Sequence, residues 1–202
     1  MSEWQSYHPD IQVILHEATD HELALAFVHR RLNVILITEY MRPEGIETLP
    51  VYREPLCVAL PSKHPLRDHD RVTAGMLSGE KILVQDWDRS HVIRDHYRAL
   101  LGPNAHLEAH PAGKQGLFML VSAGYGVTLS PISQTESGFP GVIFRPLSGT
   151  NAHIQICLGW SPQCQDPATG RFVAFVRDFM KSREPPGRSG LSAGGEKPGP
   201  SP

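Results

Sequence analysis

The sequence has few cysteines, no long hydrophobic run and almost no net charge. Its three cysteines are Cys57, Cys157 and Cys164, and the first two lie within apolar, strand-like runs. So few thiols, odd in number, argue against a disulfide framework and indicate reduced cysteines in a cytoplasmic protein. No segment approaches the roughly 18 apolar residues of a membrane span. The N-terminal MSEWQSYHPD also lacks the apolar core of a signal peptide.

The formal charge of −2 gives the chain no basic surface. We therefore do not expect this chain itself to bind nucleic acid or an anionic membrane. Its 202 residues suffice for a sizeable core or for two small lobes. The last residues, 184–202, are rich in Pro, Gly and Ser, and this composition predicts a disordered tail.

Alternating strand and helix patterns along the chain predict an α/β fold. Strands are expected at residues 11–15, 33–37, 56–60, 81–84, 107–109, 126–129, 142–144 and 153–160. Helices are expected from Asp20 to residue 31, at 73–77, from Ser90 to 101, at 114–123 and at 169–180, with Asp20 and Ser90 as N-caps. Residues 38–50 are expected to form a loop. The first strand, helix and strand form a βαβ unit, which predicts parallel strands.

Two segments carry the most information. Residues 49–66 read LPVYREPLCVALPSKHPL, a strand that stops at a proline and turns at His-Pro. Residues 116–131 read GLFMLVSAGYGVTLSP, a helix that ends at Gly124 and leads directly into a strand. With residues 7–13, 32–37 and 172–180, in this order and spacing, they resemble the effector-binding domain of LysR-type transcriptional regulators across about residues 4–183.

That resemblance implies a two-lobed type II periplasmic-binding-protein-like fold with a ligand cleft between the lobes. Residues 1–61 and 151–183 would form lobe I and residues 62–150 lobe II. The two crossovers are expected near Pro61–Ser62 and near Ser148–Ala152. Compared with the family, Asn33 replaces the usual Asp, and the opening strand and helix of lobe I are absent before Tyr7. We expect an open strand edge in lobe I, which favours pairing with a second chain.

The cleft residues are predicted from strand ends and helix starts, because open α/β sheets bind ligands beyond the C-terminal ends of their strands. The candidates are Thr38, Glu39, Asp86, Trp87, His110, Pro111, Gly113, Lys114, Gln115 and Pro131. The unpaired N–H groups at the start of helix 114–123, with the charge of Lys114, favour a carboxylate or phosphate. The effector would thus be a small organic anion. The alternatives are that Lys114 is a solvated first-turn lysine and that Trp87 is a packing residue.

Neither a metal site nor an active site is indicated. His106 and His110 are four residues apart, but Pro111 follows and no third ligand is near. The sequence has no G-x-S-x-G and no phosphate-binding loop, and Ser122 lies inside a helix end. We expect neither a cofactor nor catalysis.

The sequence thus predicts the effector-binding domain of a LysR-type regulator, which couples ligand binding to transcription control. The resemblance implies a cytoplasmic homo-oligomer, a dimer or tetramer, that reaches DNA only through a helix-turn-helix domain absent from this chain. Two alternatives stay open, a solute-binding protein without regulatory output and a truncated remnant of a regulator. The lack of a signal sequence counts against transport.

Overall fold

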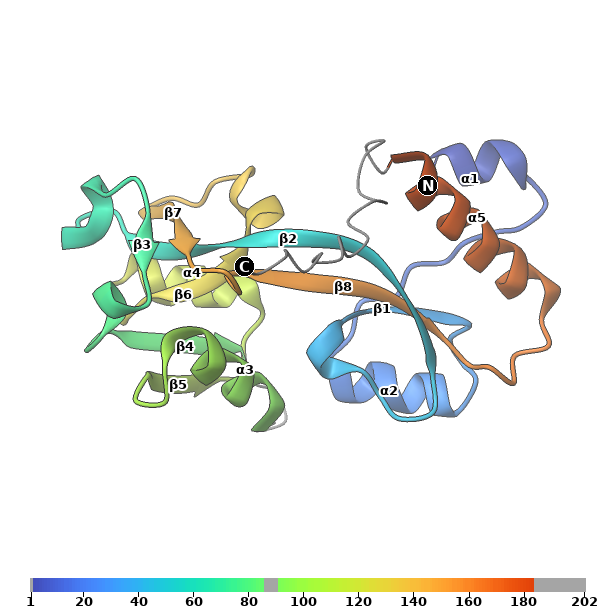
Figure 1. Ribbon diagram of the computed structural model, residues 1–202, viewed down its shortest axis with the longest axis horizontal. Helices are drawn as coiled ribbons and strands as arrows, with labels where there is room; N and C mark the ends of the chain where they lie inside the picture. The colour runs from blue at the N-terminus through green and yellow to red at the C-terminus, as the bar shows by residue number, and fades with distance from the viewer. Residues whose placement is uncertain (1, 86–90, 184–202) are drawn as a thin grey trace, which may run out of the picture.

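The computed structural model describes residues 2–85 and 91–183, which form two lobes joined through one long strand (Figure 1). This strand, β2 (Glu47–Pro61), runs through both lobes. Its residues 47–55 pair antiparallel with β8 (His153–Trp160) in lobe I. Its residues 56–61 pair with β6 (Thr128–Pro131) and β7 (Val142–Ser148) in lobe II. The change of partners therefore falls at Pro55–Leu56.

Lobe I is a small antiparallel sheet covered by helices. The strand order is β1-β8-β2, with β1 (Val34–Thr38) at the edge. Phe27 of α2 (Asp20–Val28) packs with Ile35, Ile37 and Ile46 in the core of this lobe. Gly159 of β8 lies beneath them, where an added Cβ would come within 2.9 Å of Ile46 Cδ1.

A second layer of lobe I consists of α1 (Ser2–Tyr7) and α5 (Pro167–Arg183), which lie side by side (Figure 1). Trp4 is only 2% exposed and makes edge contacts with Phe172 and Phe175, at centroid distances of 5.1 and 5.3 Å. Asn33 donates to Asp166 at 3.1 Å and so ties the start of β1 to the start of α5.

Lobe II adds β3 (Val72–Thr73) beside β7 and a parallel pair, β4 (Lys81–Gln85) and β5 (His106–His110). Its helices are α3 (His91–Leu101) and α4 (Lys114–Ser122). The short 3-10 turns of the two lobes are η1 (Glu39–Met41), η2 (Pro65–Asp68), η3 (Gly75–Leu77) and η4 (Ile132–Thr135). Backbone hydrogen bonds between residues 81–83 and Val127 join β4 to the start of β6, so both strand groups share one core.

Most predicted elements are confirmed, but the start of the chain is not. Residues 11–15 form no strand, and Val13, Ile14 and Leu15 are 42, 67 and 88% exposed. The predicted βαβ unit is therefore wrong, because β1 lies antiparallel to β8. A strand needs a partner for its N–H and C=O groups, and β8 is the partner that β1 has within the described part of the chain. The start of the chain also contains a short helix that was not predicted, α1, which ends at Tyr7.

Other differences are local. The N-cap of α2 is Thr19 rather than Asp20, because Thr19 and Glu22 form a reciprocal capping box with distances of 3.3 and 3.0 Å. The predicted helix at 73–77 is strand β3 followed by the η3 turn. The predicted loop at 38–50 is shorter, because β2 already begins at Glu47.

The crossover expected at Pro61–Ser62 coincides with the end of β2, six residues after its change of partners. The predicted second crossover, at 148–152, falls on the connection between β7 and β8. The Ser90 cap and the tail at 184–202 lie outside the described residues.

Gly126 provides a test of this packing. A Cβ at this position would lie 2.5 Å from the Lys81 carbonyl oxygen and 3.1 Å from Leu83 Cδ2. Because the close atom is backbone, Gly126→Ala should destabilise the fold by about 1–3 kcal/mol in urea unfolding. Gly170→Ala in α5 is the matched control, since nothing lies within 4 Å of its added Cβ. The control should be neutral or slightly stabilising. Equal effects of both changes would contradict the packing of β4 on β6.

Candidate functional site

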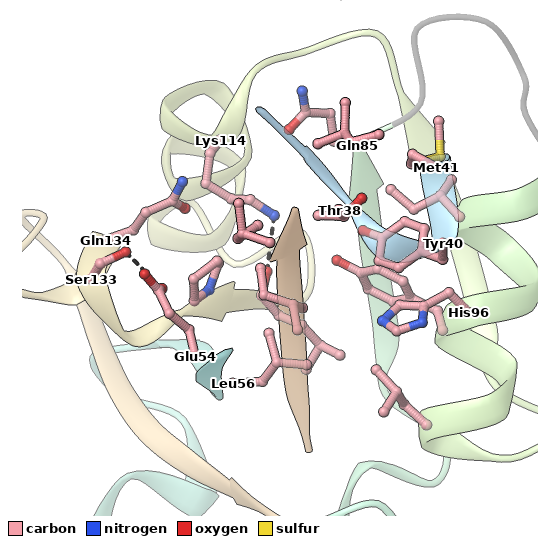
Figure 2. Close-up of a pocket in the computed structure, with 18 of the residues that line it drawn as sticks. Thr38, Tyr40, Met41, Glu54, Leu56, Gln85, His96, Lys114, Ser133 and Gln134 are labelled. Carbon is pink, nitrogen blue, oxygen red and sulfur yellow. Dashed lines mark hydrogen bonds between the residues drawn. The ribbon is translucent and has the colours of Figure 1, made fainter. Parts of the chain in front are cut away.

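A cavity of about 380 Å³ lies between the two lobes (Figure 2). From lobe I it is lined by β1, η1, β2 and β8, through Leu36, Ile37, Thr38, Tyr40, Met41, Tyr52, Glu54, Ile154 and Ile156. From lobe II it is lined by β2, β4, α3, α4, β6 and η4, through Leu56, Gln85, Ile93, His96, Tyr97, Leu100, Lys114, Leu129, Pro131, Ser133 and Gln134. Its size and its mixed apolar and polar wall are those of a small-molecule site.

Lys114 contributes the one lysine or arginine side chain among these lining residues. It lies in the first turn of α4 and extends towards β6, where its Nζ donates to the Leu129 carbonyl at 2.9 Å (Figure 2). Burial lowers the pKa of Lys114 to about 8, because a charged ammonium group loses hydration there. This hydrogen bond disfavours the alternative of a solvated first-turn lysine.

The same end of the cavity carries other hydrogen-bonding groups. Thr38, at the end of β1, lies on the lobe I side. Ser133 donates to Glu54 Oε2 at 2.8 Å, and Ser130 donates to Gln134 Oε1 at 3.0 Å. The Glu54 carboxylate is thus held by the Ser133 hydroxyl, while the ammonium group of Lys114 bonds to β6 (Figure 2).

Aromatic side chains form the other end. Tyr40 of η1 stacks on His96 of α3, with ring centroids 4.0 Å apart and an interplanar angle of 21°. These two rings come from different lobes, so they join the lobes across the cavity. Burial, followed by the effect of His153, lowers the pKa of His96, so the imidazole is neutral at pH 7. Tyr97, 5% exposed, has a raised pKa because it is buried.

The structure brings three of the ten predicted site residues into the cavity wall, namely Thr38, Lys114 and Pro131. The other described ones, Glu39, His110, Pro111, Gly113 and Gln115, are adjacent in the chain to lining residues or to the α4 start but are not in the wall themselves. Asp86 and Trp87 lie outside the described residues, and the preceding Gln85 lines the cavity.

His110 has a different partner. Its Nε2 is 3.1 Å from Glu108 Oε1, and Lys81 Nζ is 2.9 Å from Glu108 Oε2. The hydrogen bond from Lys81 is the main reason why the pKa of Glu108 is lowered. These three side chains belong to the parallel pair β4 and β5, so they act within lobe II.

Several lining residues were not predicted from the sequence. Tyr52 and Glu54 were not found because residues 38–50 were assigned to a loop and the strand was expected only from Leu56. His96 lies within a helix, so the rule that ligands bind at strand ends did not point to it, and at the end of β1 only Thr38 and Glu39 were named, not Tyr40 two residues further on. The amphipathic pattern of α3 was the available signal, because Ile93, His96 and Leu100 share the helical face that lines the cavity.

In the described part of the chain, no three His, Cys, Asp or Glu side chains are grouped as a metal site would require. No described helix is both long enough and apolar enough to span a membrane. The described cysteines are all free thiols.

The sequence matches the family model of the LysR substrate binding domain over residues 1–181. The chain therefore belongs to this family. It is 27% identical over 183 residues to the hydrogen peroxide-inducible genes activator of Pectobacterium carotovorum subsp. carotovorum, which covers 86% of the chain and 59% of that protein. It is 29% identical over 154 residues to the Hca operon transcriptional activator HcaR of Escherichia coli K12, covering 75% and 52%. The chain thus spans about half to three fifths of the length of these relatives.

Solved structures confirm the fold. The oxidized form of OxyR superposes with a TM-score of 0.73 at 22% identity, covering 90% of this chain and 86% of that one. The effector binding domain of a BenM variant gives a TM-score of 0.76 at 19% identity, with coverage of 90% and 86%. CbnR, a LysR family transcriptional regulator, also gives 0.76 at 19% identity, with 89% and 63%. The chain has the two-lobed type II periplasmic-binding-protein-like fold.

The lowered pKa of Lys114 predicts a pH-dependent stability difference. Between about 8, its pKa in the fold, and 10.5, its ordinary value, the unfolded chain binds a proton that the folded chain does not. Raising the pH through this window therefore stabilises the wild type relative to Lys114→Met, by on the order of 1–3 kcal/mol. Below pH 8 the difference should be constant. Urea unfolding of both proteins at pH 7, 8, 9 and 10 measures it, and parallel curves over the whole range would contradict a buried Lys114.

Proposed function

We propose that this chain is the effector-binding part of a LysR-type transcription regulator and that its effector is a small organic anion bound in the cavity between the lobes. The observation that carries the proposal is Lys114, a half-buried lysine that lines this cavity and whose Nζ donates to the Leu129 carbonyl. A buried charge without a partner carboxylate is costly, so a site that keeps one is suited to an anionic ligand. Within the described part of the chain, Lys114 hydrogen-bonds a carbonyl and forms no ion pair.

The surroundings support an anion at this end. Lys114 begins α4, and the N-cap Gly113 has no side chain that could cap the first N–H groups of the helix. The positive end of the helix dipole and the ammonium charge therefore reinforce each other. Glu54 is the opposing charge in the wall, and it accepts a hydrogen bond from Ser133. Thr38 and Pro131, with Lys114, are the proposed contacts from the predicted set; Glu39, Asp86, Trp87, His110, Pro111, Gly113 and Gln115 stay proposals for the rim.

The two-lobed arrangement gives such binding a regulatory consequence. A ligand that contacts both lobes favours the lobe arrangement in which both sets of contacts are made. We expect this shift to be transmitted through a homo-oligomer, a dimer or tetramer, to DNA-binding domains, as one solved neighbour, full-length CbnR, is found with its target DNA. The exposed Ile14 and Leu15 of lobe I support an oligomer contact. The cytoplasm is the proposed location, because thiols stay reduced there.

Some relatives are named for hydrogen peroxide, and the thiols of this chain argue against the same signal here. Cys57 and Cys157 are buried, and burial raises the pKa of both thiols, which disfavours the reactive thiolate. Cys157 pairs with Pro50, seven residues along β2 from Cys57, so the two lie roughly 20 Å apart. A disulfide between them would require Cα atoms within about 7 Å. These features favour a bound effector over thiol oxidation.

A thermal-shift and calorimetric screen of the 202-residue chain tests this proposal. The panel comprises aromatic and aliphatic carboxylates, amino acids and sugar phosphates. A ligand at a hundred times its Kd should add about 2.7 kcal/mol to the free energy of unfolding. Lys114→Met should weaken binding of the best anion at least tenfold, the usual loss for a hydrogen bond to a charged group.

The control is Lys63→Met, which removes an equal charge from an exposed position outside the cavity wall. It should leave the affinity within twofold of the wild type. A panel without any binder, or an anion bound equally well by Lys114→Met, would overturn the proposal.

A further inference from the structure

We propose that the effector is a hydroxylated organic anion, and that His96 reads its hydroxyl group at the end of the cavity opposite Lys114. This inference rests on the proposed function and goes beyond it, because it names a second recognition point and the chemical group that it selects. Figure 2 shows Lys114 on one side of the cavity and the stacked rings of Tyr40 and His96 on the other. A ligand that spans the cavity meets both.

The imidazole of His96 has a hydrogen-bonding atom without a partner. Its Nε2 is buried and makes no hydrogen bond within the described part of the chain. An unsatisfied buried nitrogen is unfavourable, and native proteins pair nearly all such atoms. His96 is one of the residues that line the cavity, so a ligand bound at this end lies against its ring.

A hydroxyl group fits this position better than a second charge. The neutral ring carries one donor and one acceptor nitrogen, and a hydroxyl both donates and accepts, so it suits either tautomer. Among the described residues, the ring contacts of His96 are the uncharged Tyr40 and Tyr97, and His153 is the titratable group that acts on its pKa. A carboxylate there would lose hydration without a cation to compensate it.

Tyr40 fixes the ring for this role. The stack at 4.0 Å and the edge contact with Tyr97 at 6.4 Å hold the imidazole plane from two directions. Tyr40 comes from lobe I and His96 from lobe II, so a hydrogen bond to His96 favours the arrangement in which the lobes meet. Tyr40 is therefore a positioning residue for the specificity of His96.

Matched pairs of probes test the inference. Benzoate is compared with para-hydroxybenzoate, and hexanoate with omega-hydroxyhexanoate, by calorimetry at pH 7.5. The wild type should bind the hydroxylated member of at least one pair about five- to tenfold more tightly, the usual gain from one buried hydrogen bond. His96→Phe keeps an aromatic ring against Tyr40 but removes both nitrogens, so this preference should disappear while the plain acid binds as before.

Four further variants separate the explanations. His96→Gln retains a donor and an acceptor and should restore part of the preference. His69→Phe, at an exposed histidine outside the cavity wall, should leave it unchanged. Tyr40→Ala should reduce the preference more than the affinity for the plain acid. Glu54→Gln should leave the preference for the hydroxylated acid intact. If Glu54→Gln loses this preference while His96→Phe keeps it, the inference is overturned.

The two proposals fail differently. If the acids bind through Lys114 but His96→Phe discriminates as the wild type does, the inference about His96 is wrong and the proposed function stands. If no acid binds the wild type, both are wrong.

Discussion

The arrangement of the cavity depends on one strand, β2, which belongs to both lobes. Its first nine residues pair with β8 in lobe I, and its last six pair with β6 and β7 in lobe II. Because both sheets share this strand, the hydrogen bonds of each sheet help to fix the position of the other lobe. The side chains of Tyr52, Glu54 and Leu56 lie on either side of the change of partners and line the cavity. Since β2 is continuous, the lobes cannot separate without bending this strand.

At its opposite ends the cavity holds two polar groups whose burial is unfavourable. Lys114 holds a charge that lost its hydration, and His96 holds a nitrogen that lacks a hydrogen bond among the described residues. Each lowers the stability of the ligand-free protein, and each would be relieved by the matching group of a ligand. Both unfavourably buried groups lie in the wall of one cavity, and the Tyr40–His96 stack joins the two lobes there. Such a fold is suited to convert ligand binding into a change of lobe arrangement.

Much of this could be predicted from the sequence where the signal is local. The α4 helix, its Gly124 terminus and the following β6 strand follow from residues 116–131 alone, and Lys114 followed from the helix start. The predictions that failed concern elements whose structure depends on partners distant in the sequence. Residues 11–15 have every local property of a strand, yet in the described part of the chain they pair with none.

The length of β2 and the burial of Lys114 were missed for the same reason. The extension of β2 back to Glu47 is imposed by β8, a hundred residues further on, despite Pro50 and Pro55. The burial of Lys114 results from its packing against β6, which no spacing of residues around position 114 encodes. Tyr40 and His96 meet only because η1 and α3 face each other across the cavity.

The most direct test of the account is the pKa of Lys114 itself, followed by NMR of lysine carbon-13 labelled at Cε. One lysine resonance, absent from Lys114→Met, should report a pKa of about 8 in the free protein. On saturation with a bound carboxylate that pKa should rise above its ordinary value of 10.5, because the anion stabilises the charged form. A Lys114 that titrates near 10.5 in the free protein and does not respond to any anion would contradict the central claim that a buried ammonium group makes this cavity an anion site.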